Sequence, residues 1–319
     1  MLKTWLTERF ELTVPVIGAP MAGPGEGPLA AAVSAAGGLG MVGVGATQDR
    51  DWIEGQAAVA RATGRPFGFG LMAWAVEKRP ELLEDVLGTR PALVSVSFGD
   101  FAGPVEAVRE AGVAVTVQAG NVEEALRAQD AGADFVVLRG AEGGGHGRNE
   151  IGTLPLLQAA LDRLRVPAVA AGGIGTGRGL AAALAAGAVG AWVGTAFLGC
   201  HEASNSAAAR RRLFGAAGTD TAYGRVFDVA QRLSWPEEYG GRALRNPFLE
   251  RWADRLEELA TDDAAARQLG DARAGEDFDV AYLYAGQGVG LLTEERSAAD
   301  VLAELATAEQ HLRSAVPTG

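Results

Sequence analysis

One histidine stands in a glycine-rich stretch, GAEGGGHGR at residues 140–148, which Arg139 separates from the apolar run DFVVL. Glycine loses much conformational entropy when it is ordered, so such a cluster indicates a backbone that another group must approach closely. Imidazole is the side chain best suited to proton transfer near neutral pH. His146 is therefore the candidate catalytic residue, and the alternative is a packed or surface histidine. The other two histidines, His201 and His311, have no comparable surroundings.

The histidine spacings and the cysteines of common metal sites are missing from the sequence. No His-x-His or His-x-x-x-His pair occurs, and Cys200 is the only cysteine. A cage of cysteine ligands is therefore excluded, and so is an intramolecular disulfide. We expect no metal site.

Two glycine-rich turns have the composition of a phosphate site. The segment AGGIGTGRG at residues 171–179 follows an apolar run and leads into a helix-like segment. Such a turn leaves free backbone N–H groups at a helix N-terminus, where a phosphate binds well. The segment VGTAF at residues 193–197 follows the next apolar run. The candidates are Gly172, Gly173, Gly194 and Thr195, unless these glycines only turn the chain.

A third glycine pattern, Gly38-x-Gly40-x-x-Gly43, matches the dinucleotide-binding fingerprint. That fingerprint needs a strand before it and a helix after it. Here a helix-like segment precedes the glycines and an apolar run passes through them. We therefore attribute them to helix capping and close packing.

Eight short apolar runs alternate with helix-like segments along the first two thirds of the chain. Runs that are apolar nearly throughout are typical of parallel strands covered on both faces. Their regular alternation predicts a (β/α)8 TIM barrel, an α/β fold, rather than an open doubly wound sheet. Ligands bind such barrels at the carboxyl ends of the strands, where His146 and both glycine turns fall. Glycines that would cap the helices are Gly37, Gly64, Gly88, Gly112, Gly132 and Gly187.

Residues 200–280 interrupt this alternation with polar, helical or irregular sequence. We predict a barrel from residues 1–205 plus 281–319 and an inserted, mainly helical lid subdomain from residues 206–280. Trp235 and Trp252 either close over the substrate or form the small core of the insert, and we prefer the second interpretation. Ser297 is the predicted N-cap of a helix that returns to the barrel.

The composition describes a globular chain with an acidic surface. Its 319 residues are 48% hydrophobic, and the net charge is -12 with a pI near 4.8. This charge argues against nucleic acid and anionic membranes as partners. The N-terminus has no apolar signal-peptide core, and no uninterrupted apolar stretch is long enough to span a membrane. We expect a cytoplasmic protein.

Taken together, several motifs resemble the FMN-dependent nitronate monooxygenases, formerly called 2-nitropropane dioxygenases. They are GAPMAG at residues 18–23, GAEGGGHG at 140–147, the segment from VPAVAAGG to GTAFL at 166–198, LRNPFLERW at 244–252 and YAGQGVGLL at 284–292. The resemblance covers nearly the whole chain. Related enoyl-thioester reductases and NADH:quinone reductases share the fold and similar motifs, so the resemblance indicates the cofactor better than the substrate.

The resemblance implies FMN lying across the barrel mouth and a role for each matching residue. His146 would be the catalytic residue beside the flavin N5, Gln118 would reach the polar edge of the flavin, and Gly144 would pass close to its ring. The phosphate would be held by Gly172, Gly173, Gly194 and Thr195. The ring would be lined by Ala19, Pro20 and Met21.

Three positions depart from the pattern of these relatives. Gly70 stands where relatives often have an asparagine that contacts the flavin, and Arg139 stands where they often have glutamine or aspartate. Both remain candidate cofactor-binding positions. The charge of Arg139 would either favour an anionic ligand or pair with Glu142, and Gly143 stands where alanine is usual.

The resemblance implies oxidation of alkyl nitronates, and of nitroalkanes where a base removes the α-proton, by O2 to carbonyl compounds and nitrite. The partners would be a small-molecule substrate and O2, and a homodimer is compatible. One alternative is an NAD(P)H:quinone or enoyl-thioester reductase on the same barrel. Another is a non-catalytic binding protein.

Overall fold

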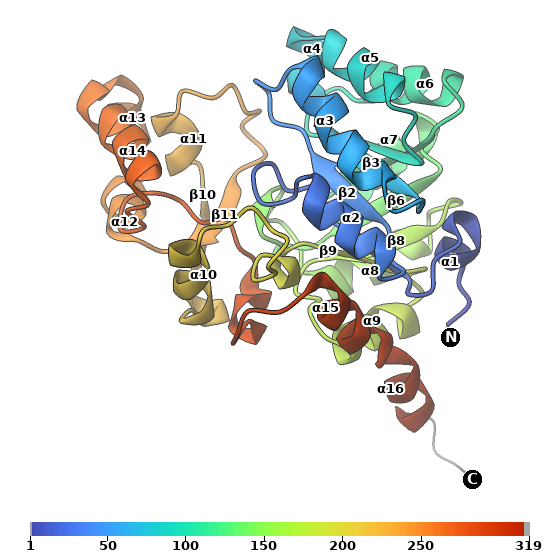
Figure 1. The fold of residues 1–319 in the computed structure, drawn as a ribbon. Coiled ribbons are helices and arrows are strands. Elements are labelled where there is room, and N and C mark those ends of the chain that lie inside the picture. Colours follow the sequence, from blue (N-terminus) through green and yellow to red (C-terminus); the bar gives the residue numbers. More distant parts are fainter. Residues whose placement is uncertain (1, 316–319) are drawn as a thin grey trace.

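The structure is a computed structural model that describes residues 2–315. Eight parallel strands form one sheet (Figure 1): β1 (Val16–Gly18), β2 (Gly40–Gly43), β3 (Phe67–Met72), β4 (Leu93–Ser97), β5 (Ala114–Ala119), β6 (Phe135–Arg139), β8 (Ala168–Ala171) and β9 (Ala191–Val193). Their order in the sheet is β1-β9-β8-β6-β5-β4-β3-β2. Ile17 and Leu39 form a parallel bridge between the two ends of that order. The sheet therefore closes on itself, which confirms the predicted barrel and excludes the open sheet.

Helices follow the strands in the predicted alternation and surround the barrel. They are α2 (Gly27–Ala35), α3 (Arg50–Arg61), α5 (Glu81–Gly88), α6 (Ala102–Glu110), α7 (Val122–Asp130), α8 (Thr153–Leu161), α9 (Gly177–Ala185) and α15 (Ala298–Ala306). As predicted, Ser297 caps α15, and its hydroxyl and Asp300 form a capping box. Helix α15 packs between α2 and α9, which completes the outer ring.

Five of the six predicted capping glycines have a positive φ, as a left-handed helix cap requires. Gly88 does not, and that prediction is wrong. It is the last residue of α5, and Arg90 takes the left-handed conformation with φ 56°. The chain therefore turns two residues later than the glycine pattern indicates.

Side chains fill the barrel interior. Phe135, Val137 and Trp192 are buried there, and Leu6 and Phe10 of α1 (Trp5–Phe10) pack against the same cluster. The fingerprint-like glycine Gly40 lies at a contact between a strand and a helix, in agreement with the expected close packing. A β-carbon on Gly40 would overlap the backbone of Ala30 in α2, so this glycine allows helix and strand to touch.

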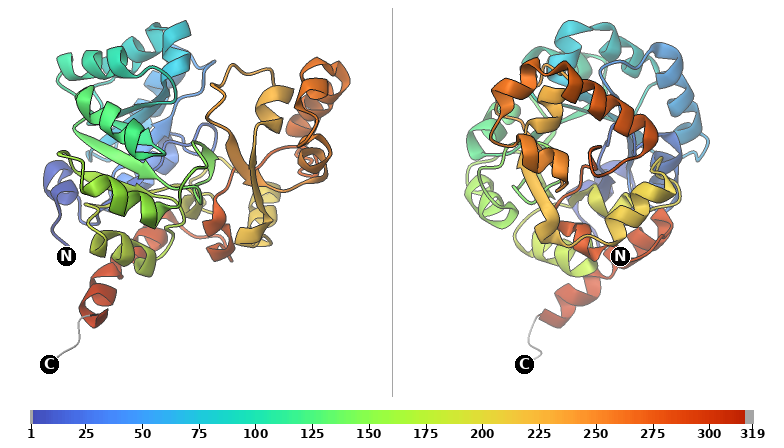
Figure 2. Two further views of the ribbon diagram at one scale, coloured as in Figure 1. Left: turned by 180° about the vertical axis from the view of Figure 1, so that it is seen from behind. Right: turned by 90° about the vertical axis from the view of Figure 1, so that its left-hand side faces the viewer.

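The segment after β9 leaves the barrel and lies across one end of it (Figure 2). Its elements are η1 (Thr195–Phe197), α10 (Ala207–Phe214), η2 (Gly218–Asp220), β10 (Thr221–Gly224), α11 (Val226–Ala230), β11 (Gly241–Leu244), α12 (Pro247–Trp252), α13 (Leu256–Thr261) and α14 (Asp263–Gly275). The chain returns through η3 (Gln287–Leu291) to α15, and α16 (Ala308–Ala315) follows. A short helix, α4 (Ala73–Lys78), follows β3.

The insert and the barrel share a small antiparallel sheet. β7 (Gly145–His146), from the loop after β6, pairs with β11, which pairs with β10. The glycine-rich stretch that contains His146 is therefore an edge strand of the insert. This pairing joins His146, in the loop after β6, to Gly241, 95 positions later in the chain (241 − 146).

The two insert tryptophans have different environments. Trp252 is buried with Phe227 and Phe248 in the core of the insert, as preferred from the sequence. Trp235 instead packs on barrel side chains, with ring centroids 5.4 Å from Trp74 and 5.2 Å from Phe98. The preferred interpretation is therefore correct for Trp252 and wrong for Trp235, because the loop before β11 folds back onto the barrel.

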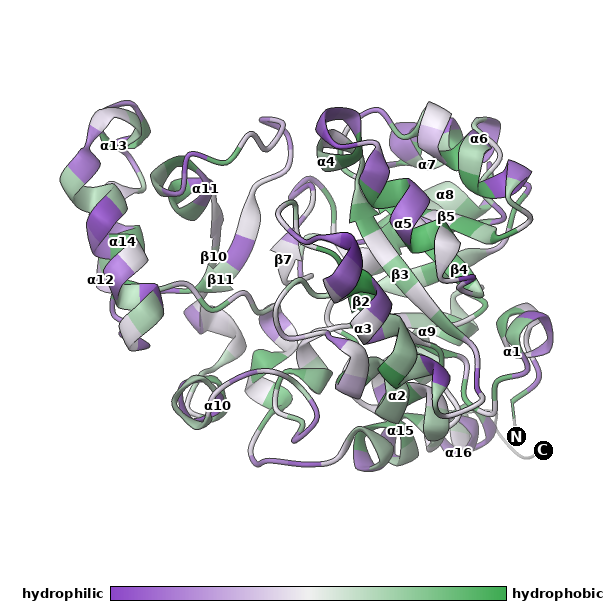
Figure 3. Cartoon of the chain, turned by 45° about the horizontal axis from the view of Figure 1, so that its top comes forward, coloured by the Kyte–Doolittle hydropathy of each residue, from purple (hydrophilic) through white to green (hydrophobic). Residues whose placement is uncertain are grey.

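Hydropathy follows this architecture. The barrel strand β3 is largely hydrophobic, whereas α14 of the insert carries hydrophilic patches (Figure 3).

Between residues 2 and 315, no helix combines the length and apolar character that crossing a membrane requires.

Candidate active site

Two glycines give His146 its backbone setting. Gly145 has φ 67° and Gly147 has φ 156°, values that residues with a β-carbon rarely adopt. His146 lies between them, and its register partner across the small sheet is Gly241 of β11. The glycine cluster therefore allows the chain to reverse after β6 and present His146 to the insert.

Three side chains from the insert and its return segment surround the imidazole of His146. Its Nε2 lies 2.8 Å from Oδ1 of Asp228 in α11. The Trp235 ring stacks on the imidazole at a centroid distance of 3.6 Å and an interplanar angle of 2°. Tyr284 lies 5.1 Å away, and its hydroxyl donates to the same Asp228 oxygen. His146 is thus an oriented, mostly buried residue rather than a surface one.

Sequence reasoning missed Asp228 and Tyr284. Asp228 is 82 residues from His146 in the chain, within a segment that offers only ordinary helix composition. Tyr284 begins the YAGQGVGLL motif, so the motif indicated the segment but not the role of its tyrosine.

Residues of the barrel and the insert hold the His146 loop from opposite sides. Gln118 of β5 donates from Nε2 to the carbonyl oxygen of His146 at 3.3 Å. From the insert, the Tyr223 hydroxyl donates to the carbonyl oxygen of Gly147 at 2.9 Å. Nearby, the Tyr239 hydroxyl donates to the buried carboxylate of Glu124 in α7. These bonds couple the position of the loop to the docking of the insert.

Arg139 at the end of β6 is a buried cation with carbonyl partners. Its guanidinium donates to the backbone oxygens of Gly143, Gly144, Gly145 and Arg148. Among the described residues, no carboxylate lies within ion-pair distance of it. Burial lowers the pKa of Arg139 to about 10, which still leaves the side chain protonated at neutral pH.

Of the two alternatives for Arg139, the pairing with Glu142 is absent from the ion pairs of residues 2–315. Glu142 instead accepts hydrogen bonds from the backbone N–H of Thr153, at 3.0 and 3.1 Å, and from its hydroxyl at 3.0 Å. Thr153 is the first residue of α8, so the carboxylate lies at a helix N-terminus, where negative charge is favoured. Glu142 orients the loop rather than facing solvent.

The side chain of Arg139 fills the space that side chains at the nearby positions 143 and 147 would need. A β-carbon on Gly143 would lie 2.7 Å from Nε of Arg139, and one on Gly147 would lie 2.7 Å from Nη1. Real β-carbons essentially never approach heavy atoms so closely. The two differences from the relatives' pattern, at positions 139 and 143, are therefore linked. The Arg139 side chain takes the space of an alanine methyl group at position 143.

The two glycine turns follow neighbouring strands, since Ala171 of β8 is the register partner of Trp192 of β9. After β8, Gly172 and Gly173 have φ values of 111° and 71°, and α9 begins at Gly177 behind the Thr176 cap. Within residues 2–315, the backbone N–H groups of Gly173 and Thr195 have no recorded hydrogen-bond acceptor. Two unpartnered donors beside a helix N-terminus form an anion-binding geometry.

A third segment reaches these turns. The Gly286 N–H donates to Oγ1 of Thr195 at 2.9 Å, and a β-carbon on Gly144 would lie 2.4 Å from the same Gly286 nitrogen. The AGQGVG sequence therefore passes between the His146 loop and the turn after β9. Sequence reasoning gave Gly286 no role, although its glycine spacing carried the same signal of close approach.

The turn after β1, which contains Ala19, Pro20 and Met21, lies beside the turn after β9. A β-carbon on Gly194 would lie 3.3 Å from Cβ of Ala19 and 3.5 Å from Sδ of Met21. Pro20 of the same turn packs against Gly70 of β3, where a β-carbon would lie 2.3 Å from Cγ of the proline. Gly70 is thus required by the adjacent Pro20 ring, which explains why an asparagine is absent there.

Gly70→Asn should lower the free energy of unfolding by about 1–3 kcal/mol, because the new side chain overlaps the ring of Pro20 in a closely packed barrel. Urea unfolding followed by tryptophan fluorescence would measure the change. Gly88→Ala is the matched control, because a β-carbon there meets no atom within 4 Å. Equal stability of Gly70→Asn and the parent would contradict the steric argument.

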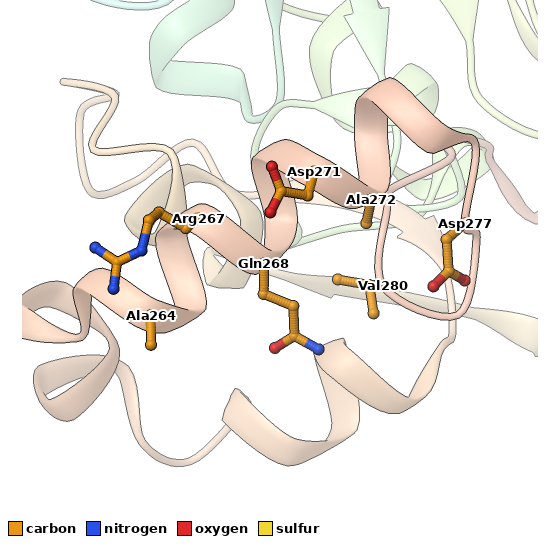
Figure 4. A pocket seen from close by; sticks show the side chains of 7 residues that line it. All are labelled: Ala264, Arg267, Gln268, Asp271, Ala272, Asp277 and Val280. Atoms are coloured by element: carbon orange, nitrogen blue, oxygen red, sulfur yellow. The ribbon is translucent and has the colours of Figure 1, made fainter.

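These contacts link the predicted site residues into one arrangement at the carboxyl ends of the strands. A pocket drawn in Figure 4 lies elsewhere, between α14 and the turn that ends at Val280, and its lining includes none of them. In the described part of the chain, no three His, Cys, Asp or Glu residues are grouped so that they could hold a metal ion.

Comparison with known proteins gives a consistent result. The model of the family described as nitronate monooxygenase matches residues 3–85 and 75–308. A nitronate monooxygenase from Paraburkholderia phytofirmans is 32% identical over 357 residues, which cover 95% of this chain and 93% of that protein.

Two solved structures superimpose along nearly the whole chain. FabK from Thermotoga maritima has a TM-score of 0.83 at 27% identity and covers 99% of this chain and 100% of its own. Nitroalkane oxidase from Streptomyces ansochromogenes has a TM-score of 0.81 at 30% identity and covers 98% of this chain and 99% of its own. By sequence, this chain belongs to the nitronate monooxygenase family, a family of oxidoreductase enzymes.

Proposed function

We propose that this enzyme binds FMN at the mouth of its barrel and uses O2 to oxidise alkyl nitronates to carbonyl compounds and nitrite. The observation that carries the proposal is the arrangement around His146. An oriented imidazole lies in the same group of contacts as two glycine turns that offer unpartnered N–H donors. Family membership supports the same reaction.

The residues present fit the cofactor. Gly173 and Thr195, with Gly172 and Gly194 beside them, would hold the phosphate through N–H groups that no protein acceptor uses. The small or apolar residues Ala19, Pro20, Met21, Gly70 and Gly144 would border the flavin ring. Gln118 would meet its polar edge, and Arg139 would act by holding the loop that carries His146.

When bound, FMN supplies the electron transfer between nitronate and O2. The chain contributes position and proton chemistry. His146 would hold the nitro group as a hydrogen-bond donor, or remove the α-proton when the substrate is a neutral nitroalkane. Residues 206–280, the proposed lid, would keep water from this position, with Trp235 covering one face of the imidazole.

The visible spectrum of the purified protein and a nitrite assay test the proposal. We expect flavin absorption bands, release of FMN on denaturation, and nitrite in proportion to the alkyl nitronate consumed. A colourless protein that is not reconstituted by FMN would contradict the cofactor assignment. Quinone-dependent oxidation of NAD(P)H without nitrite from any nitronate would instead favour the reductase alternative.

The proposal includes a cytoplasmic location and a homodimer. Cell fractionation would test the location, and light scattering on the purified protein would test the oligomeric state.

A further inference from the structure

Asp228 is a buried carboxylate that lies at ion-pair distance from a histidine. It is 1% exposed, and its Oδ1 lies 2.8 Å from Nε2 of His146. Within residues 2–315, no arginine or lysine forms an ion pair with it at 4.0 Å or less. The Tyr284 hydroxyl donates to the same oxygen at 3.4 Å. Asp228 is therefore committed to the imidazole rather than to a cation on the surface.

The position of this carboxylate determines which ring nitrogen of His146 can accept a proton from a substrate, because Nε2 already bonds Asp228. An ionised carboxylate only accepts hydrogen bonds, so it favours the imidazole tautomer with the hydrogen on Nε2. The lone pair then lies on Nδ1. Trp235 stacks on one face of the ring at 3.6 Å. Turning the ring over about its Cβ–Cγ bond would place a carbon rather than Nε2 against Asp228, so the hydrogen bond holds the ring in this orientation.

The same carboxylate lies where the countercharge to an imidazolium would be needed. An imidazolium formed in this mostly buried position would be costly without a countercharge, and Asp228 supplies one at hydrogen-bond distance. Asp228 belongs to α11 of the insert, whereas His146 follows the barrel strand β6. The pair is complete only where the insert contacts the barrel.

We propose that Asp228 is a positioning residue that makes Nδ1 of His146 the base for neutral nitroalkanes, an inference that rests on the proposed function. In this step the α-carbon–hydrogen bond breaks and the proton forms a bond with Nδ1. The electron pair of the broken bond moves onto the nitro group, so the product is the nitronate. Asp228 retains the Nε2 hydrogen bond and balances the charge of the imidazolium.

The first test reads the tautomer directly and needs no turnover. The flavin-loaded protein is labelled with 15N-histidine, and its imidazole signals are followed with pH until each ring is neutral. The chain has only three histidines, and His201→Ala and His311→Ala assign two of the signals. We expect the neutral His146 ring to carry its hydrogen on Nε2. A hydrogen on Nδ1 in the parent protein would overturn the proposal.

The second test separates proton removal from later chemistry. Asp228→Asn should lower kcat on neutral nitroethane by 100-fold or more, on the order expected when a general base loses its orientation. The rate on preformed ethyl nitronate should fall less than 5-fold, because that substrate needs no proton removal. Asp271→Asn, an exposed residue of α14 shown in Figure 4, is the matched control and should retain both rates.

If Asp228→Asn keeps the nitroethane rate within 3-fold of the parent, the proposal is overturned, even where the parent protein carries its hydrogen on Nε2. If Asp228→Asn fails to fold, the tautomer of the parent protein still decides between support and rejection. Failure of the proposed function has a different signature: the parent protein would form no nitrite from either substrate, while the imidazole signals would remain readable.

Discussion

Replacing His146 with alanine should lower kcat on a neutral nitroalkane by about 100- to 10,000-fold, the range typical of a lost general base. FMN should remain bound, because the phosphate would be held by the turns after β8 and β9 rather than by the imidazole. Alanine also removes one partner of Asp228, so a buried carboxylate keeps only the longer hydrogen bond from Tyr284. Stability should therefore be measured alongside turnover.

The nitrite assay with two substrates identifies what His146 does. A large loss on nitroalkane with a small loss on preformed nitronate indicates proton removal. A large loss on both indicates that His146 also holds the nitro group. His201→Ala is the control, since His201 is exposed and its imidazole contacts the surface residue Glu295. Full activity of His146→Ala on both substrates, with FMN bound, would remove His146 from the mechanism.

Arg139 and Gly143 should behave as one unit in a double-mutant cycle. Gly143→Ala alone should lower the free energy of unfolding by about 1–3 kcal/mol, because its β-carbon would lie 2.7 Å from Nε of Arg139. Arg139→Gln alone should lower it by about 3 kcal/mol, because buried carbonyls that lose a donor each contribute about 1–3 kcal/mol. The double variant should lose less than the sum, since the shorter side chain makes room for the alanine.

Urea unfolding of the four proteins gives the coupling energy, which we expect to be about 1–3 kcal/mol. Gly55→Ala is the control for adding a methyl group, because a β-carbon there meets no atom within 4 Å. Effects of the two substitutions that add within about 0.5 kcal/mol would mean that the residues are independent. The nitrite rate of each variant shows whether the loop must be held this way for turnover.

The fold was largely predictable because its signals are local. Apolar runs and helix-like segments alternate along the chain, and each element depends mainly on residues near it in sequence. The cap at Ser297 and the glycine at 173 are also local, since a cap or a left-handed turn involves only a few consecutive residues. Gly88 shows the limit, because a glycine near a helix end permits a cap without requiring one.

The site was predictable only in part. The glycines around His146 indicated a close approach, and the strand count indicated the barrel mouth. Trp235, however, was expected in the core of the insert and lies on the barrel instead. The partner of Arg139 was left open between Glu142 and an anionic ligand, because a sequence lists possible charges without their distances. The four loop carbonyls that accept from Arg139 cannot be read from a sequence.

By itself, the sequence determined the barrel, and it predicted that His146 and the glycine turns lie at the carboxyl ends of the strands. Only the tertiary structure decided that Asp228 engages Nε2 of His146 and that Arg139 takes the space of a β-carbon at position 143. The physical reason is the range of the interactions. Secondary structure and turns arise from neighbours in the chain, whereas a hydrogen bond across 82 residues depends on how the insert docks.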